Sequence, residues 1–381
     1  MAELPAAAPA DHSVRDRMVA VLFAIGIALP GLALTWTWSR TLTRFENRSA
    51  APWPAFGWSR DFPAAFDAAF SDRFGGRDAL VQFHHGALLR MFGVSSLSTV
   101  MVGNDGWYYW LGEDGHSLDR HYRGTMEFPQ GRVDDTVAEF RRRNEWLAAR
   151  GIAYLVVVVP EKFTIYPEHL PAWVARSPGA TPYDRVRDAL RREGHVTFVD
   201  LRPALLAAKA RERLYFKTDS HWNYNGAMVG YDEIMRVIQE KLGDKLPQIV
   251  PAKQPPYTPG MDFYSGDLLG MLGMASRIRE DDVAPFGKAL AELERHCPRR
   301  VEKNEPQGIR SYECGRPELP RAVVLRDSMA DLWVPMLTTN FSRIVYASTY
   351  ALGRALIERE KPDIVIDELV ERKLNWPGTF P

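Results

Sequence analysis

Residues 214–226 (LYFKTDSHWNYNG) hold the side chains whose types and spacing suit acid–base chemistry. Asp219 and His221 stand two positions apart there, and in an extended segment residues i and i+2 point to the same side of the backbone. A carboxylate and an imidazole in one pocket can take up and return a proton when a nucleophile lies beside them. The candidate nucleophile is Ser328, in the sequence AVVLRDSMADLW further along the chain.

Ser328 follows an apolar run at 322–325 and precedes a helical pattern over 329–341. In open parallel sheets, ligands bind outside the carboxyl ends of the strands, and a helix N-terminus adds unpaired N–H groups. We therefore predict Ser328 as nucleophile, His221 as its general base and Asp219 as the carboxylate that orients the imidazole. The Ser328 amide is expected to stabilise a developing oxyanion.

Other interpretations exist for both Ser328 and the Asp219/His221 pair. A serine after a strand often only caps the next helix, and a D-x-H pair can be a surface pair or part of a metal site. The sequence shows no second His/Asp cluster beside Asp219 and His221, so no metal is predicted.

Five apolar runs alternate with helical patterns from residue 129 onward, which predicts strands near 152–159, 196–199, 322–325, 343–347 and 363–367. The run at 152–159 (IAYLVVVV) has no polar alternation, which is typical of a parallel strand buried on both faces. We expect an α/β fold, with a three-layer parallel sheet flanked by helices. Within it, 243–320 is rich in Pro, Gly and Met and is predicted to be a long irregular insertion, a lid or substrate wall.

The N-terminal region predicts the compartment. Residues 18–38 carry no charge over 21 positions, about the length that crosses a bilayer as a helix. We predict a cytoplasmic segment at 1–17, an uncleaved transmembrane anchor at 18–38, a linker with juxtamembrane helices at 39–98 and an exported catalytic domain at 99–381. The alternatives for residues 18–38 are a cleaved signal peptide and a buried helix.

Composition limits the partners. The 381-residue chain has formal net charge zero, so charge gives no reason to expect nucleic-acid binding. Its only cysteines, Cys297 and Cys314, lie in the part predicted to be exported, where two nearby cysteines indicate one disulfide. No C-x-x-C or His cluster completes a zinc site with them.

A series of short motifs runs through most of the chain beyond residue 45: ENR (46–48), SDRFGGR (71–77), GNDGWYY (103–109), VVVPEKFTIYPEHLP (157–171), TDSHWN (218–223), VLRDSM (324–329) and IDELVERKL (366–374). In type and order they resemble the exported alginate O-acetyltransferase-like family of the SGNH-hydrolase superfamily. The resemblance implies an SGNH-like fold and the same roles for Ser328, His221 and Asp219. It also implies acetyl transfer to hydroxyls of an alginate-like surface polysaccharide.

The resemblance further implies no cofactor, a membrane-bound O-acyltransferase as acetyl-donor partner, and a single-pass inner-membrane location with a periplasmic body. Arg326 stands where a G-D-S pattern would place glycine. The side chains assigned to the oxyanion hole or to substrate binding are Arg326, Asn223, Trp222, Tyr224 and Tyr264. Core packing is the alternative for the three aromatic residues.

Two other functions fit the same residues. A carbohydrate acetylesterase would use the same three side chains with water as acceptor. A non-catalytic polysaccharide-binding or scaffold protein would not need Ser328 at all.

Overall fold

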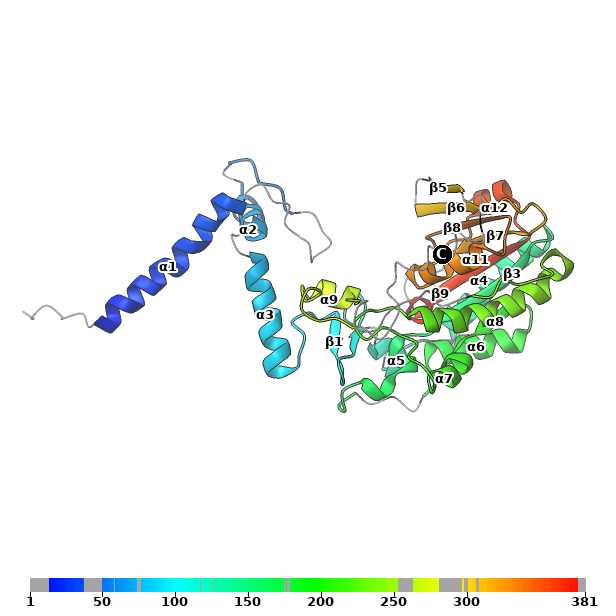
Figure 1. The fold of residues 1–381 in the computed structure, drawn as a ribbon, viewed down its shortest axis with the longest axis horizontal. Helices are drawn as coiled ribbons and strands as arrows, with labels where there is room; N and C mark the ends of the chain where they lie inside the picture. The colour runs from blue at the N-terminus through cyan, green and yellow to red at the C-terminus, as the bar shows by residue number, and fades with distance from the viewer. Residues whose placement is uncertain are drawn as a thin grey trace, which may run out of the picture. The chain divides into compact units, whose positions relative to one another are not determined.

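A computed structural model of the chain forms two compact units, Met1–Phe92 with Met271–Met274, and Gly93–Gly270 with Ala275–Pro381 (Figure 1). The structure describes residues 14–37, 50–57, 59–73, 77–116, 118–125, 127–174, 176, 179–252, 263–280, 297, 301–305 and 308–375. The ENR motif at 46–48 lies outside these residues, as do positions 74–76 of SDRFGGR.

The first unit is helical. Its helices are α1 (Val14–Thr37), α2 (Phe62–Arg73) and α3 (Arg77–Phe92). On α2 the rings of Phe62, Phe66 and Phe70 stack in succession, as their i, i+4 spacing on one helix face allows. Within the described part of the chain, no helix is both long and apolar enough for a membrane crossing. The predicted span at 18–38 runs beyond the residues whose side chains are described.

The second unit contains a seven-stranded sheet in the order β4-β3-β9-β7-β8-β6-β5. The first five of these strands are parallel to one another. A separate antiparallel hairpin, β1 and β2, turns around Asn104-Asp105-Gly106. The strands are β1 (Val100–Val102), β2 (Tyr108–Trp110), β3 (Ala153–Val159), β4 (Thr197–Asp200), β5 (Val301–Glu305), β6 (Ile309–Glu313), β7 (Arg321–Leu325), β8 (Arg343–Ala347) and β9 (Ile364–Val370).

Helices and short helical turns connect these strands. The α-helices are α4 (Gln130–Ala148), α5 (Lys162–Ile165), α6 (Pro182–Glu193), α7 (Arg202–Ala208), α8 (Tyr224–Leu242), α9 (Asp267–Met271), α11 (Trp333–Thr338) and α12 (Arg354–Glu360). The shorter turns are η1 (Leu118–Tyr122), η2 (Pro167–His169), η3 (Gly243–Lys245), η6 (Ser328–Leu332) and η7 (Glu371–Asn375).

Strand β3 shows why the domain has three layers. Leu155, Val157 and Val159 belong to one hydrophobic core, together with apolar residues of α8 and α11. The alternate residues Tyr154, Val156 and Val158 belong to a second core, with α4, α6 and α12. Because successive strand residues point to opposite faces, an unbroken apolar run fits a strand covered by helices on both sides. The predicted α/β sheet flanked by helices is confirmed.

The predicted parallel sheet needs one correction. Strands β5 and β6 lie inside the stretch 243–320, predicted to be irregular, and β6 pairs antiparallel with both β5 and β8. Their sequences, VEKNE and IRSYE, are too polar to indicate strands, because a strand at the edge of a sheet need not be buried on both faces. Cys297 and Cys314 form a disulfide in this region.

Candidate active site

Ser328 lies three residues beyond the end of β7, as the first residue of η6, and it is exposed. The side chain of Asp327 caps η6 by accepting a hydrogen bond from the Met329 amide at 2.9 Å. Its second oxygen accepts hydrogen bonds from the Val370 amide (2.8 Å) and the Tyr350 hydroxyl (3.2 Å). Asp327 therefore ties the serine turn to the end of β9, and the Ser328 amide, at the first helical position, has no partner within the helix.

The loop that carries Asp219 and His221 joins α7 to α8. The prediction that Asp219 and His221 share one side of the backbone assumed an extended segment. The loop instead bends sharply between the Tyr215 and Trp222 backbones, which pair as a short bridge. Asp219 Oδ1 accepts a hydrogen bond from the His221 amide at 2.9 Å, a contact that a bent backbone permits. The two side chains still meet, as predicted, because the turn folds the carboxylate back toward the imidazole.

The structure brings the three predicted side chains into one hydrogen-bonded series. His221 Nδ1 lies 2.6 Å from Asp219 Oδ1, and His221 Nε2 lies 2.8 Å from Ser328 Oγ. These distances are within the range in which a base accepts a hydroxyl proton while a carboxylate orients the other ring nitrogen. The order along the chain, Asp–His–Ser, has no bearing on this geometry.

The residues around Asp219 and His221 determine the protonation states of these two side chains. Burial by itself would raise the pKa of Asp219, but hydrogen bonds from His221, from the Tyr264 hydroxyl and from the Asp267 amide bring that pKa well below its usual value. For His221, burial lowers the pKa, while the bond to Asp219 and its negative charge raise it by more. Asp219 is thus ionised at neutral pH, and the imidazolium is stabilised when it forms.

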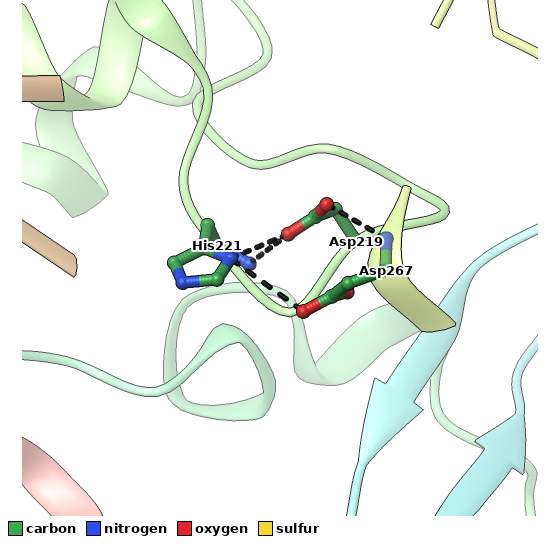
Figure 2. Close-up of side chains that lie close together, drawn as sticks. All are labelled: Asp219, His221 and Asp267. Carbon is green, nitrogen blue, oxygen red and sulfur yellow. Dashed lines mark hydrogen bonds and ion pairs between the residues drawn. The ribbon is translucent and has the colours of Figure 1, made fainter. Parts of the chain in front are cut away.

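A second carboxylate, Asp267, reaches the same side of the His221 ring as Asp219, from a separate segment (Figure 2). Among the described residues, Asp219, His221 and Asp267 are the one group of side chains that could hold a metal ion, with atoms within 4.8 Å of one another. Each of the four carboxylate oxygens already accepts a hydrogen bond from a protein group. All four oxygens therefore take part in the hydrogen-bond network around His221.

Lys162, which follows β3, anchors the Asp219 loop. Its ammonium group donates to the carbonyls of Phe216 (3.0 Å), Lys217 (3.2 Å) and Asp219 (2.6 Å). Burial lowers the pKa of Lys162 to about 8, although nearby carboxylates such as Asp219 favour the charged form. Lys162 was not among the predicted site residues, and the available signal for it was a lysine just beyond a buried strand, in the sequence PEK.

Three of the side chains predicted to contact substrate instead cap a helix or pack in the hydrophobic core. Asn223 caps α8 with its oxygen, and its amide nitrogen donates to the Arg213 carbonyl at 2.7 Å. Trp222 is fully buried against Trp333, and Tyr224 belongs to the same hydrophobic core. The assignment of these residues to the oxyanion hole or to sugar stacking is wrong, because their atoms are enclosed or already bonded.

Arg326 and Tyr264 also have roles other than those predicted. The Arg326 guanidinium is buried, donates to the Asp327 carbonyl at 2.9 Å and pairs with Asp331 at 2.6 Å. These contacts stabilise the backbone around the serine turn. The Tyr264 hydroxyl donates to Asp219 Oδ2 at 2.6 Å, so this aromatic residue supports the carboxylate.

Comparison with known proteins supports the fold and the family. Residues 100–290, half of the chain, match the family model described as the SGNH hydrolase-like domain of acetyltransferase AlgX. This range includes Asp219 and His221 and ends before Ser328. The chain is 26% identical over 237 residues to the protein named probable alginate O-acetylase AlgJ of Pseudomonas aeruginosa. It is 26% identical over 142 residues to the protein of the same name in Pseudomonas syringae pv. tomato.

These matches are partial. They take in 60% and 37% of this chain, and the chain spans 54% and 34% of the length of the two relatives. Among solved structures, Bacillus cereus PatB1 with a sulfonyl adduct aligns over 74% of this chain and 96% of its own, with a TM-score of 0.50 and 14% identity. The O-acetyltransferase domain of Pseudomonas putida AlgJ aligns over 72% and 92%, with a TM-score of 0.45 and 17% identity. The likeness to PatB1 concerns the fold alone, and the family-model match shows that this chain belongs to the AlgX-type SGNH hydrolase-like acetyltransferase family.

Proposed function

We propose that this protein is an O-acetyltransferase that carries an acetyl group on Ser328 and passes it to a hydroxyl of a polysaccharide. The observation that carries the proposal is the hydrogen-bonded series from Asp219 through His221 to an exposed Ser328. The family supports the acetyltransferase class. An alginate-like polymer is the proposed acceptor, because the curated relatives are named alginate O-acetylases.

The first half-reaction acetylates the serine. His221 Nε2 takes the hydroxyl proton of Ser328 while Oγ attacks the carbonyl carbon of an acetyl ester. The tetrahedral oxyanion faces the Ser328 amide at the start of η6, which has no partner within that helix. The donor oxygen then leaves with the proton from His221, and acetyl-Ser328 remains.

The second half-reaction transfers the acetyl group. A sugar hydroxyl gives its proton to His221 Nε2 and attacks the acetyl carbon, and Ser328 Oγ leaves and recovers that proton. Asp219 holds Nδ1 and stabilises the imidazolium in both halves. Lys162 supports the loop that presents Asp219.

The proposed setting is outside the cytoplasm, with residues 18–38 as a single-pass inner-membrane anchor and the catalytic body in the periplasm. The disulfide between Cys297 and Cys314 supports an oxidising compartment, since such bonds persist there. The proposed donor partner is a membrane-bound O-acyltransferase, as implied by the family resemblance.

Assaying the full chain with an acetyl ester donor and a de-acetylated uronate polymer tests this proposal. We expect polymer-bound acetyl to accumulate with the wild type and to be lost with Ser328→Ala. Release of free acetate without polymer acetylation would favour the esterase. Equal polymer acetylation with wild type and Ser328→Ala would favour a non-catalytic role.

A further inference from the structure

A second aspartate beside the proposed catalytic histidine has no assigned role. We propose that Asp267 is a positioning residue, which holds His221 through Ser220 and shares with Asp219 the stabilisation of the imidazolium. The inference rests on the proposed Ser328 chemistry and deepens it, because it identifies two carboxylates where the proposed mechanism uses one.

The contacts of Asp267 lead directly to His221. Its two oxygens accept hydrogen bonds from the Ser220 amide (2.7 Å) and the Ser220 hydroxyl (2.5 Å). The Ser220 hydroxyl oxygen lies 3.3 Å from His221 Nδ1, and Asp267 Oδ2 lies 3.7 Å from the same nitrogen. Asp267 therefore approaches the ring nitrogen that faces Asp219, both directly and through one hydroxyl.

The backbone around Asp267 is fixed against the Asp219 loop. The Asp267 amide donates to Asp219 Oδ2 at 2.9 Å, and the Gly266 amide donates to Thr218 Oγ1 at 2.9 Å. A Cβ atom on Gly266 would lie 2.4 Å from the Thr218 carbonyl, so only glycine permits this approach. These contacts hold the Asp267 carboxylate beside His221.

A purely structural role as the start of α9 fits these contacts poorly. A helix-capping carboxylate accepts hydrogen bonds from amides of its own helix. Both oxygens of Asp267 instead accept from Ser220, which lies on the other loop. The hydrogen bonds therefore connect α9 to the Asp219 loop at Ser220, the residue next to His221.

The charged groups that face His221 determine whether loss of the Asp267 charge raises or lowers the pKa of His221. Asp219 and Asp267 are negative and favour the imidazolium, while Arg372 of η7 is positive and disfavours it. Ser328, on η6, is neutral and faces the other ring nitrogen. Removing the charge of Asp267 should therefore lower the pKa of His221. Because 41% of the Asp267 side chain is exposed, solvent screens its charge and limits the size of this shift.

The test is an NMR titration of His221 in full-length protein with labelled histidine, in which the His221 signal is assigned by its absence in His221→Gln. The titration is compared for wild type, Asp267→Asn, Ser220→Ala and a charge control, Asp188→Asn, whose side chain is exposed on α6. The pH dependence of kcat/KM for acetyl ester cleavage is measured on the same samples.

We expect Asp267→Asn to move both the titration midpoint and the acid limb of kcat/KM to lower pH. We also expect the plateau value of kcat/KM to fall by less than about 100-fold in Asp267→Asn, against about 10⁴-fold in Asp219→Asn. Ser220→Ala should move the midpoint in the same direction, and Asp188→Asn should not move it. An unchanged His221 midpoint in folded Asp267→Asn and Ser220→Ala would overturn the proposal, as would activity that chelators abolish and zinc restores. The titration does not depend on acetyl transfer, so an inactive wild type would count against the proposed function and leave this inference tested.

Discussion

The ammonium group of Lys162 is the link between the end of β3 and the Asp219 loop. Replacing it in Lys162→Met leaves the carbonyls of Phe216 and Asp219 without their buried donor. We expect a loss of about 1–3 kcal/mol in the free energy of unfolding. We also expect a fall of at least about 10-fold in kcat/KM, because the Asp219 carboxylate loses its fixed position.

Denaturant unfolding and ester-cleavage kinetics of the same samples measure both effects. Lys245→Met is the matched control, because the Lys245 side chain is 61% exposed and pairs at the surface with Asp363. Wild-type kcat/KM in Lys162→Met would show that the loop holds its shape without this anchor.

The three side chains that the structure joins by hydrogen bonds were easier to predict from the sequence than the residues that support them. Asp219, His221 and Ser328 were predictable, because their residue types permit few other pairings and Ser328 follows a recognisable buried strand. Asp267 and the hydroxyl of Tyr264 were not assigned these supporting roles. Both lie in a Pro-, Gly- and Met-rich stretch with no helical or strand periodicity, so no pattern indicated which of its residues would contact Asp219.

At the scale of elements, the disulfide joins two cysteines 17 positions apart in the region of β5 and β6. Removing it in a Cys297→Ser/Cys314→Ser variant frees a short loop of the unfolded chain. We expect this to cost about 3 kcal/mol of stability. Because both sulfurs lie against the Thr338 carbonyl of α11, a helix that carries none of Asp219, His221 and Ser328, kcat/KM should stay within about twofold of wild type.

Thermal unfolding of oxidised wild type, reduced wild type and the double variant checks this prediction. A large loss of activity at temperatures where the variant is folded would mean that the β5–β6 region supports the site directly.

The strands were predicted correctly where burial on both faces requires a mostly apolar sequence. The central strands β3, β7 and β9 are covered on both faces and are mostly apolar, and their bounds were found to within a few residues. The edge strands β5 and β6 are held by backbone pairing and carry charged residues, so their sequences look like loops. The predicted helix at 329–341 begins instead as the short turn η6 and continues as α11, since the chain must turn tightly after Ser328.

At the scale of the whole molecule, Glu371 makes stability depend on pH. This residue is 1% exposed and accepts hydrogen bonds from the Glu161 amide and the Thr164 hydroxyl. Burial raises the pKa of Glu371 to about 7, so the folded protein keeps this proton at pH values where the unfolded chain has lost it. The stability from this proton is fully present below about pH 4.5 and is lost as the pH rises through about 7.

Glu371→Gln removes this titration and keeps an oxygen that can accept both hydrogen bonds. We expect its stability relative to wild type to increase between pH 5 and pH 8, by on the order of 2 kcal/mol. Denaturant unfolding at several pH values measures the difference, with Glu358→Gln, whose side chain is 56% exposed, as control. A difference that does not change with pH would show that Glu371 is ionised throughout this range.

The central claim is that Ser328 carries the acetyl group, and intact mass after brief reaction with p-nitrophenyl acetate tests it most directly. The full chain should gain the mass of one acetyl group, located by peptide mapping to Ser328. The adduct should be absent from Ser328→Ala and should form far more slowly in His221→Ala, because no base takes the hydroxyl proton. A folded wild type that gains no acetyl group, or an adduct that persists in Ser328→Ala, would contradict the account.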